Sequence, residues 1–225
     1  MTGRQIALHY PLDATAIRNF DLFHKTLYAW NAHMDLTAVP ESEALERHYL
    51  DALTALPFLR DNERVIDVGT GAGFPGLPLL IARTTLRMTL LDARAKRAAF
   101  LAGALAQLEG VSAEVVHARA EELAKTRRGD YSAAISRAVA PLPILIEWLM
   151  PFLCIGGRCV LWKGTDIQKE LVEAARVSPL LGGGPPRVQD VKVGKRAFSL
   201  VFIDKLAETA AQFPRKSGIA LKRPL

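Results

Sequence analysis

Residues 65–81, VIDVGTGAGFPGLPLLI, constrain the fold of this chain more than any other stretch. Val65 and Ile66 are apolar and β-branched, which favours a buried strand. Asp67 and a glycine-rich turn follow, and an apolar run resumes at Leu77. A strand, a glycine turn and a helix start in this order are typical of a cofactor cradle, because glycine adopts unusual backbone angles and has no Cβ to hold a ligand away. We therefore expect a cofactor site in residues 69–76.

The glycine spacing leaves more than one cofactor open. The GxGxxG spacing of residues 71–76 fits a dinucleotide fingerprint, a weak signal by itself that would indicate a nicotinamide oxidoreductase. The longer pattern DxGxGxG of residues 67–73 is typical of class I methyltransferases, which use S-adenosylmethionine (SAM). Asp92 closes the next apolar run about twenty residues on, where an acid that binds ribose hydroxyls belongs. We expect SAM, with a dinucleotide or a ligand-free turn as the alternatives.

Residues 1–60 predict an N-terminal helical extension. Apolar residues there recur near the helical period, and Asp13 is a suitable N-cap for the first long helix. A polar break at 31–39 precedes a second helix predicted over 41–56. His48 and Asp51 share one face of that helix, where a surface or interdomain hydrogen bond is favoured over a catalytic pair.

Residues 61–225 alternate between apolar strands and helical stretches, which is typical of a doubly wound α/β fold. We expect the Rossmann-like fold of class I methyltransferases, with seven mostly parallel strands, helices on both faces and a final antiparallel hairpin. The predicted strands are 64–69, 87–92, 113–117, 131–136, 158–163, 187–193 and 197–203. The predicted helices are 77–83, 94–108, 121–126, 141–153 and 167–176.

Ligands of such a sheet bind beyond the carboxyl ends of the strands, which nominates the loops 69–76, 92–93, 118–121 and 136–141. In a SAM enzyme the last of these faces the methyl group. It has neither an Asn/Asp-Pro-Pro-aromatic motif for amine methylation nor a cysteine for a covalent pyrimidine adduct. What remains is an acceptor with a free lone pair, such as N7 of guanine. Its methylation is a direct displacement that needs alignment and no general base.

Arg137 is the charged residue of that loop and our candidate for a positioning role in catalysis. It could donate to O6 of guanine, contact a phosphate, or hold the SAM carboxylate. The alternative is a purely structural salt bridge with the helix-start acids, Glu121 and Glu122. Lys163, after the fifth strand, is a second candidate for phosphate contact.

The charge pattern points to a polyanionic partner. The chain carries a net charge of +6, and no acid follows Glu208. A basic tail beside a basic hairpin is a reasonable RNA footprint, although a solvated tail is equally compatible. The candidate RNA-binding residues are Lys163, Lys195, Arg196, Arg215, Lys216, Lys222 and Arg223.

Composition predicts a cytoplasmic protein without a membrane partner. No apolar run approaches the length of a membrane span, and the N-terminus has no apolar signal region. Cys154 and Cys159 match no zinc spacing and the five histidines are scattered, so we expect no metal and two buried thiols in a reducing compartment. Nothing demands a dimer, and we expect a monomer.

Motifs along nearly the whole chain resemble those of the RsmG (GidB) family. The glycine turn continues into Phe74-Pro75-Gly76, and the basic end carries Pro214-Arg215-Lys216. Further matching segments are Trp30-Asn31, Leu36-Thr37, Arg47-His48 with Asp51, Leu90-Leu91-Asp92, Lys96-Arg97 with Phe100-Leu101, Arg119-Ala120-Glu121, Ser136-Arg137-Ala138, Gly156-Gly157, Lys163-Gly164, Gly218 and Pro224-Leu225.

The resemblance implies SAM-dependent methylation, with S-adenosylhomocysteine as product, of N7 of a guanine (guanine 527) in bacterial 16S ribosomal RNA. The substrate would be the RNA or the small subunit that contains it. Ala120 and Glu121 would bracket the adenine, and Asp92 would hold the ribose. Phe74 would pack beside the cofactor. The full expected cofactor set is Gly69, Gly71, Gly73, Phe74, Asp92, Ala120, Glu121 and Arg137.

Three positions depart from the family pattern: Asp35 stands where Asn is usual, Ala93 where Ser is common, and Phe213 where Tyr is common. Three other activities fit parts of the sequence. A small-molecule or protein methyltransferase leaves the basic tail unexplained. A nicotinamide oxidoreductase rests on residues 71–76 alone, and a non-catalytic RNA-binding module would have kept the fold without turnover.

Overall fold

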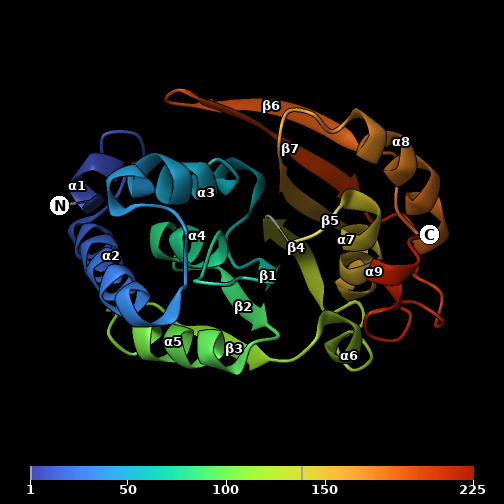
Figure 1. The fold of residues 1–225 in the computed structure, drawn as a ribbon, viewed down its shortest axis with the longest axis horizontal. Helices are drawn as coiled ribbons and strands as arrows, with labels where there is room; N and C mark the ends of the chain where they lie inside the picture. Colours follow the sequence, from blue (N-terminus) through green and yellow to red (C-terminus); the bar gives the residue numbers. More distant parts are fainter. Residues whose placement is uncertain (1, 138) are drawn as a thin grey trace.

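A seven-stranded sheet forms the centre of the computed structural model, which describes residues 2–137 and 139–225. The strand order is β3-β2-β1-β4-β5-β7-β6 (Figure 1). The strands are β1 (Arg64–Val68), β2 (Arg87–Asp92), β3 (Ala113–His117), β4 (Tyr131–Arg137), β5 (Leu153–Lys163), β6 (Arg187–Val193) and β7 (Arg196–Asp204). The first five pair in parallel, and β7 is antiparallel to both neighbours. The predicted Rossmann-like sheet and its final hairpin are confirmed.

One strand boundary differs from the prediction by more than one residue. β5 begins at Leu153, five residues before the predicted start, and its pairing with β4 shifts register between Tyr131 and Ala133. Gly156 has a positive φ, and a Cβ on Gly157 would lie 2.8 Å from the Ser132 carbonyl oxygen. The two glycines therefore let the strand continue through an irregular stretch that the sequence pattern indicates as a loop.

Helices cover both faces of the sheet, as predicted. Alternate strand residues point to opposite faces of the sheet and belong to two buried clusters. One cluster includes α4, α5 and the N-terminal helices, and the other includes α6, α7 and α8. These clusters set the orientation of the strand ends and therefore of the loops that follow them. The helices are α4 (Gly76–Ala82), α5 (Ala95–Leu105), α6 (Ala120–Leu123), α7 (Leu142–Leu149), α8 (Gln168–Val177) and α9 (Ile219–Lys222).

The N-terminal extension begins with α1 (Thr2–Ile6) and α2 (Ala14–Met34). Asp13 caps α2 by accepting a hydrogen bond from the Ala16 N–H at 2.7 Å, which confirms the predicted N-cap. Asp35 ends the helix in the left-handed conformation, which Asn adopts readily and Asp also tolerates. The departure from the family pattern at this position is therefore compatible with the local backbone.

The continuous α-helix predicted over 41–56 is wrong in type. A 3₁₀ turn, η1 (Glu41–Glu43), leads into a π-helical turn, η2 (Leu45–Leu50), then α3 (Asp51–Leu53) and a second 3₁₀ turn, η3 (Leu56–Phe58). Six consecutive residues from position 48 to 53 are buried. An amphipathic α-helix buries only one stripe, so this segment is enclosed on more than one side.

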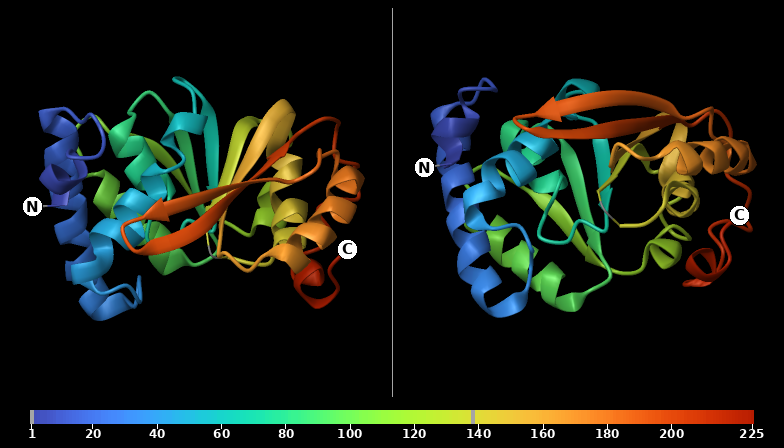
Figure 2. Two further views of the ribbon diagram at one scale, coloured as in Figure 1. Left: turned by 90° about the horizontal axis from the view of Figure 1, so that it is seen from above. Right: turned by 45° about the horizontal axis from the view of Figure 1, so that its top comes forward.

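The β6–β7 hairpin reaches across the molecule to the N-terminal extension (Figure 2). At its turn a Cβ on Gly194 would collide with the Glu46 carboxylate of η2, and Arg196 pairs with Asp51 at 3.0 Å. The hairpin turn and the N-terminal extension thus meet beyond the carboxyl ends of the central strands. None of the helices in the described ranges combines the length and apolarity needed to cross a membrane.

Candidate functional site

The glycine turn after β1 is held from the neighbouring strand. Gly69, Gly71 and Gly73 all have positive φ values, which residues with a Cβ adopt only with strain. The N–H groups of Gly69 and Thr70 both donate to the Leu91 carbonyl oxygen of β2. The turn therefore depends on glycine, and its shape is fixed by the strand that ends in Asp92.

Asp92 connects the turn to the next strand end. One carboxylate oxygen accepts from the Gly71 N–H at 2.9 Å and lies 3.3 Å from Nη1 of Arg97, while the other accepts from the Arg94 N–H at 2.9 Å. Asp92 is only 4% exposed yet lines the cavity described below. Its position beside the turn is where the sequence analysis places a ribose-binding acid.

Asp67, the first acid of the motif, has a structural position. It is fully buried, and its Oδ2 accepts from the Gly76 N–H at 2.8 Å, at the start of α4. Burial raises the pKa of Asp67 to about 7. The first N–H of α4, which the motif makes available for a ligand, thus bonds to Asp67 instead.

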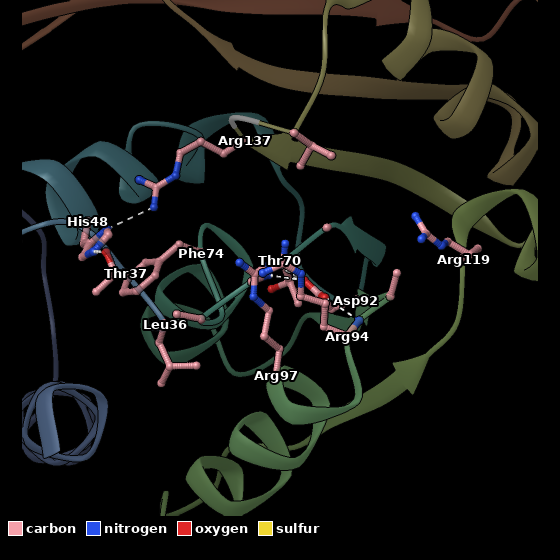
Figure 3. Close-up of a pocket in the computed structure, with 15 residues that line it drawn as sticks. Leu36, Thr37, His48, Thr70, Phe74, Asp92, Arg94, Arg97, Arg119 and Arg137 are labelled. Atoms are coloured by element: carbon pink, nitrogen blue, oxygen red, sulfur yellow. Dashed lines mark hydrogen bonds and ion pairs between the residues drawn. The ribbon is translucent and has the colours of Figure 1, made fainter. Parts of the chain in front are cut away.

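A cavity of about 580 Å³ opens beside the turn (Figure 3). We call it the cofactor cavity. The predicted cofactor residues that line it are Gly69, Gly71, Phe74, Asp92 and Arg137. Its other lining residues are Leu36, Thr37, His48, Thr70, Ala72, Ala93, Arg94, Arg97, Arg119 and Val139.

Three predicted cofactor residues lie beside this lining. A Cβ on Gly73 would contact Leu101 and Leu77, so this glycine allows α4 and α5 to pack closely. Ala120 and Glu121 begin α6, and the Glu121 carboxylate accepts from the Gly218 N–H of the C-terminal tail at 3.1 Å. Arg119, one residue earlier, is the member of this loop that lines the cavity. The adenine contacts of Ala120 and Glu121 remain predictions.

His48 and Phe74 form one wall of the cofactor cavity. Their rings stack with centroids 4.2 Å apart and an interplanar angle of 11°, and the Arg137 guanidinium lies 5.3 Å from the Phe74 ring centroid. Nδ1 of His48 is 3.2 Å from Nη2 of Arg137, and its Nε2 is 2.8 Å from the Thr37 hydroxyl. Because arginine can only donate, Nδ1 accepts and Nε2 carries the proton. Burial and the nearby arginines lower the pKa of His48 to about 3, so the ring is neutral.

Arg137 connects the sheet to the N-terminal extension. Its Nη1 donates to the Arg47 carbonyl oxygen at 3.0 Å and lies 3.5 Å from Oδ1 of Asp51. His48 and Asp51 of the N-terminal extension thus each contact Arg137 at the end of β4. The salt bridge expected from Arg137 to Glu121 or Glu122 is wrong in its partner, because Arg137 pairs with Asp51 and also lines the cavity.

The predicted RNA-binding residues fall in three places. Lys163 is the last residue of β5 and pairs with Glu170 of α8 at 2.7 Å. Lys195 and Arg196 lie at the hairpin turn, with Arg196 held by Asp51. Arg215 makes a two-pronged ion pair with the buried Glu147 of α7, at 2.8 and 2.6 Å. Lys216, Lys222 and Arg223 are exposed.

Sequence reasoning missed several lining residues outside the glycine motif. Leu36 and Thr37 reach the cavity from the loop after α2, and Arg94 and Arg97 from the start of α5. The resemblance held a signal for Leu36, Thr37 and Arg97, because the Leu36-Thr37 and Lys96-Arg97 segments belong to its motifs, but it held none for Arg94. No periodicity or spacing rule would have placed them beside residues 69–76.

Comparison with known proteins gives consistent matches. The family model described as rRNA small subunit methyltransferase G matches residues 16–199. The protein of that name from Roseiflexus castenholzii is 41% identical over 219 residues, covering 95% of this chain and 94% of the relative. Its counterpart from Alkaliphilus metalliredigens is 34% identical over 225 residues, covering 97% and 94%.

Solved structures support the fold. A precorrin-6y C5,15-methyltransferase from Geobacter metallireducens superposes with a TM-score of 0.54 at 17% identity, over 76% of this chain and 92% of that one. A protein from Corynebacterium glutamicum superposes with a TM-score of 0.55 at 18% identity, over 91% and 96%. At these identities the likeness concerns the fold alone.

Proposed function

The chain belongs to the family of rRNA small subunit methyltransferase G, and we propose that it methylates N7 of a guanine in 16S ribosomal RNA. In full, the proposal is transfer of the SAM methyl group to guanine 527 of the bacterial small subunit, in the cytoplasm and by a monomer. The observation that carries it is a cofactor cavity built on the glycine turn, in a chain that matches this family over residues 16–199.

The residues of the cofactor cavity fit SAM. Its volume of about 580 Å³ lies within the usual range of small-ligand pockets. A Cβ on Gly69 would lie 2.6 Å from the Val139 side chain, so the turn leaves no room for a larger residue at this wall. Asp92 offers carboxylate oxygens for ribose hydroxyls, and Arg94, Arg97, Arg119 and Arg137 offer donors for the cofactor carboxylate.

Bound SAM supplies a sulfonium-activated methyl group, and the guanine N7 supplies a lone pair. The protein therefore has to align the two and exclude water, without removing a proton. His48 suits this role, because both of its ring nitrogens are bonded to protein groups and the ring is neutral. With Phe74 it presents a flat aromatic wall, and Arg137 fixes the His48 ring by donating a hydrogen bond to its Nδ1.

The test is incubation of the protein with radiolabelled SAM and small ribosomal subunits that lack the modification. We expect label in 16S RNA, and chemical cleavage should map 7-methylguanosine to a single position. Subunits that already carry the modification are the control and should accept no label. Label in protein or a small metabolite alone would overturn the proposal, and RNA binding without SAM affinity would indicate a non-catalytic module.

Deletion of residues after Pro214 separates an RNA substrate from a small one. If the basic tail contacts RNA, its removal should weaken RNA binding and reduce the dependence of that binding on salt. SAM binding should be retained, provided that circular dichroism shows the truncated protein to be folded. Turnover of a small-molecule acceptor would not depend on the tail.

A further inference from the structure

A second cavity of about 410 Å³ adjoins the cofactor cavity at Arg137 and His48. We call it the acceptor cavity. Both residues line this cavity as well as the cofactor cavity, so the two spaces share a wall. The remaining lining comes from the N-terminal extension, the end of β5 and the start of β7: Val39, Arg47, Asp51, Trp162, Lys163, Gly164, Arg196, Ala197 and Phe198.

The lining combines aromatic surface with positive charge. Trp162 and Phe198 supply aromatic rings, and Arg47, Arg137, Lys163 and Arg196 supply four cationic side chains against one carboxylate, Asp51. Aromatic and guanidinium planes stack on bases, and cations attract the RNA backbone. Such a lining fits a nucleotide better than an apolar or cationic ligand.

Asp51 is the exception in this basic lining. Its side chain is 5% exposed, and its Oδ2 accepts from Nη1 of Arg196 at 3.0 Å. Its Oδ1 has no hydrogen-bond partner within the part of the chain that the structure describes, and Arg137 approaches it only to 3.5 Å. Unsatisfied buried oxygens are rare and unfavourable, so a ligand that brings two N–H donors to this carboxylate would be stabilised there.

Arg196 shows what kind of donor Asp51 accepts. Its guanidinium is planar with N–H groups on adjacent nitrogens, and the N1–C2–N2 part of guanine has the same arrangement. The Arg196 side chain is 38% exposed, so it can leave Asp51 without crossing the core. A guanine edge could thus replace it, and the released guanidinium would be free to contact an RNA phosphate.

We infer that the acceptor cavity takes the guanine to be methylated and that Asp51 selects guanine by accepting from N1–H and the exocyclic amine. Arg137 would donate to O6. This inference rests on the proposed function. N7 and O6 lie on the same edge of guanine. Because Arg137 lines both cavities, a guanine whose O6 accepts from Arg137 has N7 toward the cofactor cavity. Adenine presents an acceptor at N1, which Asp51 would repel.

The experiment compares guanosine with inosine at the methylated position of reconstituted small subunits. Inosine lacks only the exocyclic amine and keeps N1–H, O6 and N7, so it remains a chemically competent acceptor. For the unaltered protein we expect kcat/KM to be at least about 10-fold higher for guanosine, since a hydrogen bond to a charged group is lost with inosine. With Asp51→Asn this preference should fall to about threefold or less, because a neutral amide accepts more weakly.

Asp204→Asn is the matched control, since Asp204 also pairs with an arginine of the same hairpin, Arg187, but lies outside the acceptor cavity. Its guanosine preference should stay unchanged. Asp51→Glu, which keeps the carboxylate, should retain a preference above that of Asp51→Asn. Thermal unfolding and S-adenosylhomocysteine affinity identify any variant that has lost its fold.

The outcomes separate the two levels of the proposal. An Asp51→Asn protein that is slower but keeps the full preference for guanosine would overturn the inference, because Asp51 would then only hold the arginines. Absence of any preference in the unaltered protein would overturn it as well. If the unaltered protein methylates neither subunit, the proposed function fails instead.

Discussion

The two cavities that meet at Arg137 differ in how the chain builds them. The cofactor cavity rests mainly on two consecutive strand ends: the turn after β1 and Asp92 at the end of β2. The acceptor cavity draws on the N-terminal extension, the end of β5 and the β7 side of the hairpin, and the first of these lies more than a hundred residues before the other two in the sequence. The first is thus a property of the sheet, and the second depends on how segments outside the parallel strands close over it.

This difference explains why one arginine has such a central position. Arg137 ends β4, contacts His48 and the Arg47 carbonyl group, and approaches Asp51. It therefore couples the parallel strands of the sheet to the N-terminal extension. The predictions below test whether the two cavities respond separately, or together, to substitution.

The largest effect is expected from Arg137→Ala, which removes the shared wall. Methyl transfer should fall by about 100-fold or more, because loss of alignment affects donor and acceptor together. The free energy of unfolding should fall by about 3 kcal/mol, because Asp51 stays buried with one partner fewer. Steady-state kinetics and urea unfolding measure the two.

Arg18→Ala is the control. Because it removes an exposed ion pair with Glu109, it should lower the free energy of unfolding by less than about 1 kcal/mol. Unchanged methyl transfer by Arg137→Ala would contradict the account.

Arg215→Ala tests whether the C-terminal tail belongs with the acceptor cavity or with the scaffold. Glu147 is 1% exposed and receives both side-chain bonds from Arg215, so the substitution leaves a buried carboxylate without its cation. The free energy of unfolding should fall by about 3 kcal/mol. Lys222→Ala, at an exposed position of the same tail, should leave stability within about 0.5 kcal/mol. Equal stability of the two variants would show that the ion pair has no structural role.

Asp92→Asn and Arg47→Ala should show that the two cavities bind different ligands. Asp92→Asn should weaken S-adenosylhomocysteine binding by about 10-fold or more, because hydrogen bonds to a charged carboxylate are lost, and should leave RNA affinity unchanged. Arg47→Ala should do the reverse, raising the KM for subunits several-fold and reducing the salt slope of RNA binding by about one. Calorimetry and filter binding measure the two ligands. Loss of both affinities in either variant would contradict the separation.

A smaller effect concerns pH. The pKa of His48 is about 3 in the folded protein, below its ordinary value of 6.5, so protonation favours the unfolded chain. Its contribution to stability is complete above pH 6.5 and is lost progressively as the pH falls toward 3. Between pH 7 and pH 5 the folded protein should lose about 1–2 kcal/mol more than a His48→Gln variant does. Asp67, with a raised pKa, acts in the opposite direction in both proteins and therefore cancels from the difference. Parallel pH profiles would show that His48 is not buried as described.

The parts that sequence alone could predict are those determined by local patterns. The positions of the strands, the hairpin and the turn at 69–76 follow from apolar periodicity and glycine spacing, which act over a few residues. Asp92 could be placed because the parallel pairing of β1 and β2 brings two consecutive strand ends together. These features need no knowledge of distant contacts.

The parts that sequence could not predict depend on tertiary packing. The π-helical turn at Leu45–Leu50 arises where the segment is enclosed on more than one side, which no helical period signals. From the sequence Arg215 is predicted to be an unpaired basic residue, because no neighbouring residue indicates an ion pair with the buried Glu147, sixty-eight residues away. The acceptor cavity is the same kind of feature, since Asp51 and Arg196 are 145 residues apart.

A crystal structure with S-adenosylhomocysteine and guanosine monophosphate tests the central claim most directly. The account predicts the cofactor ribose at Asp92, the guanine edge on Asp51 in the acceptor cavity, and N7 facing the methyl-bearing sulfur where the two cavities adjoin at Arg137 and His48. A guanine bound away from Asp51, or a cofactor whose ribose lies away from Asp92, would contradict it.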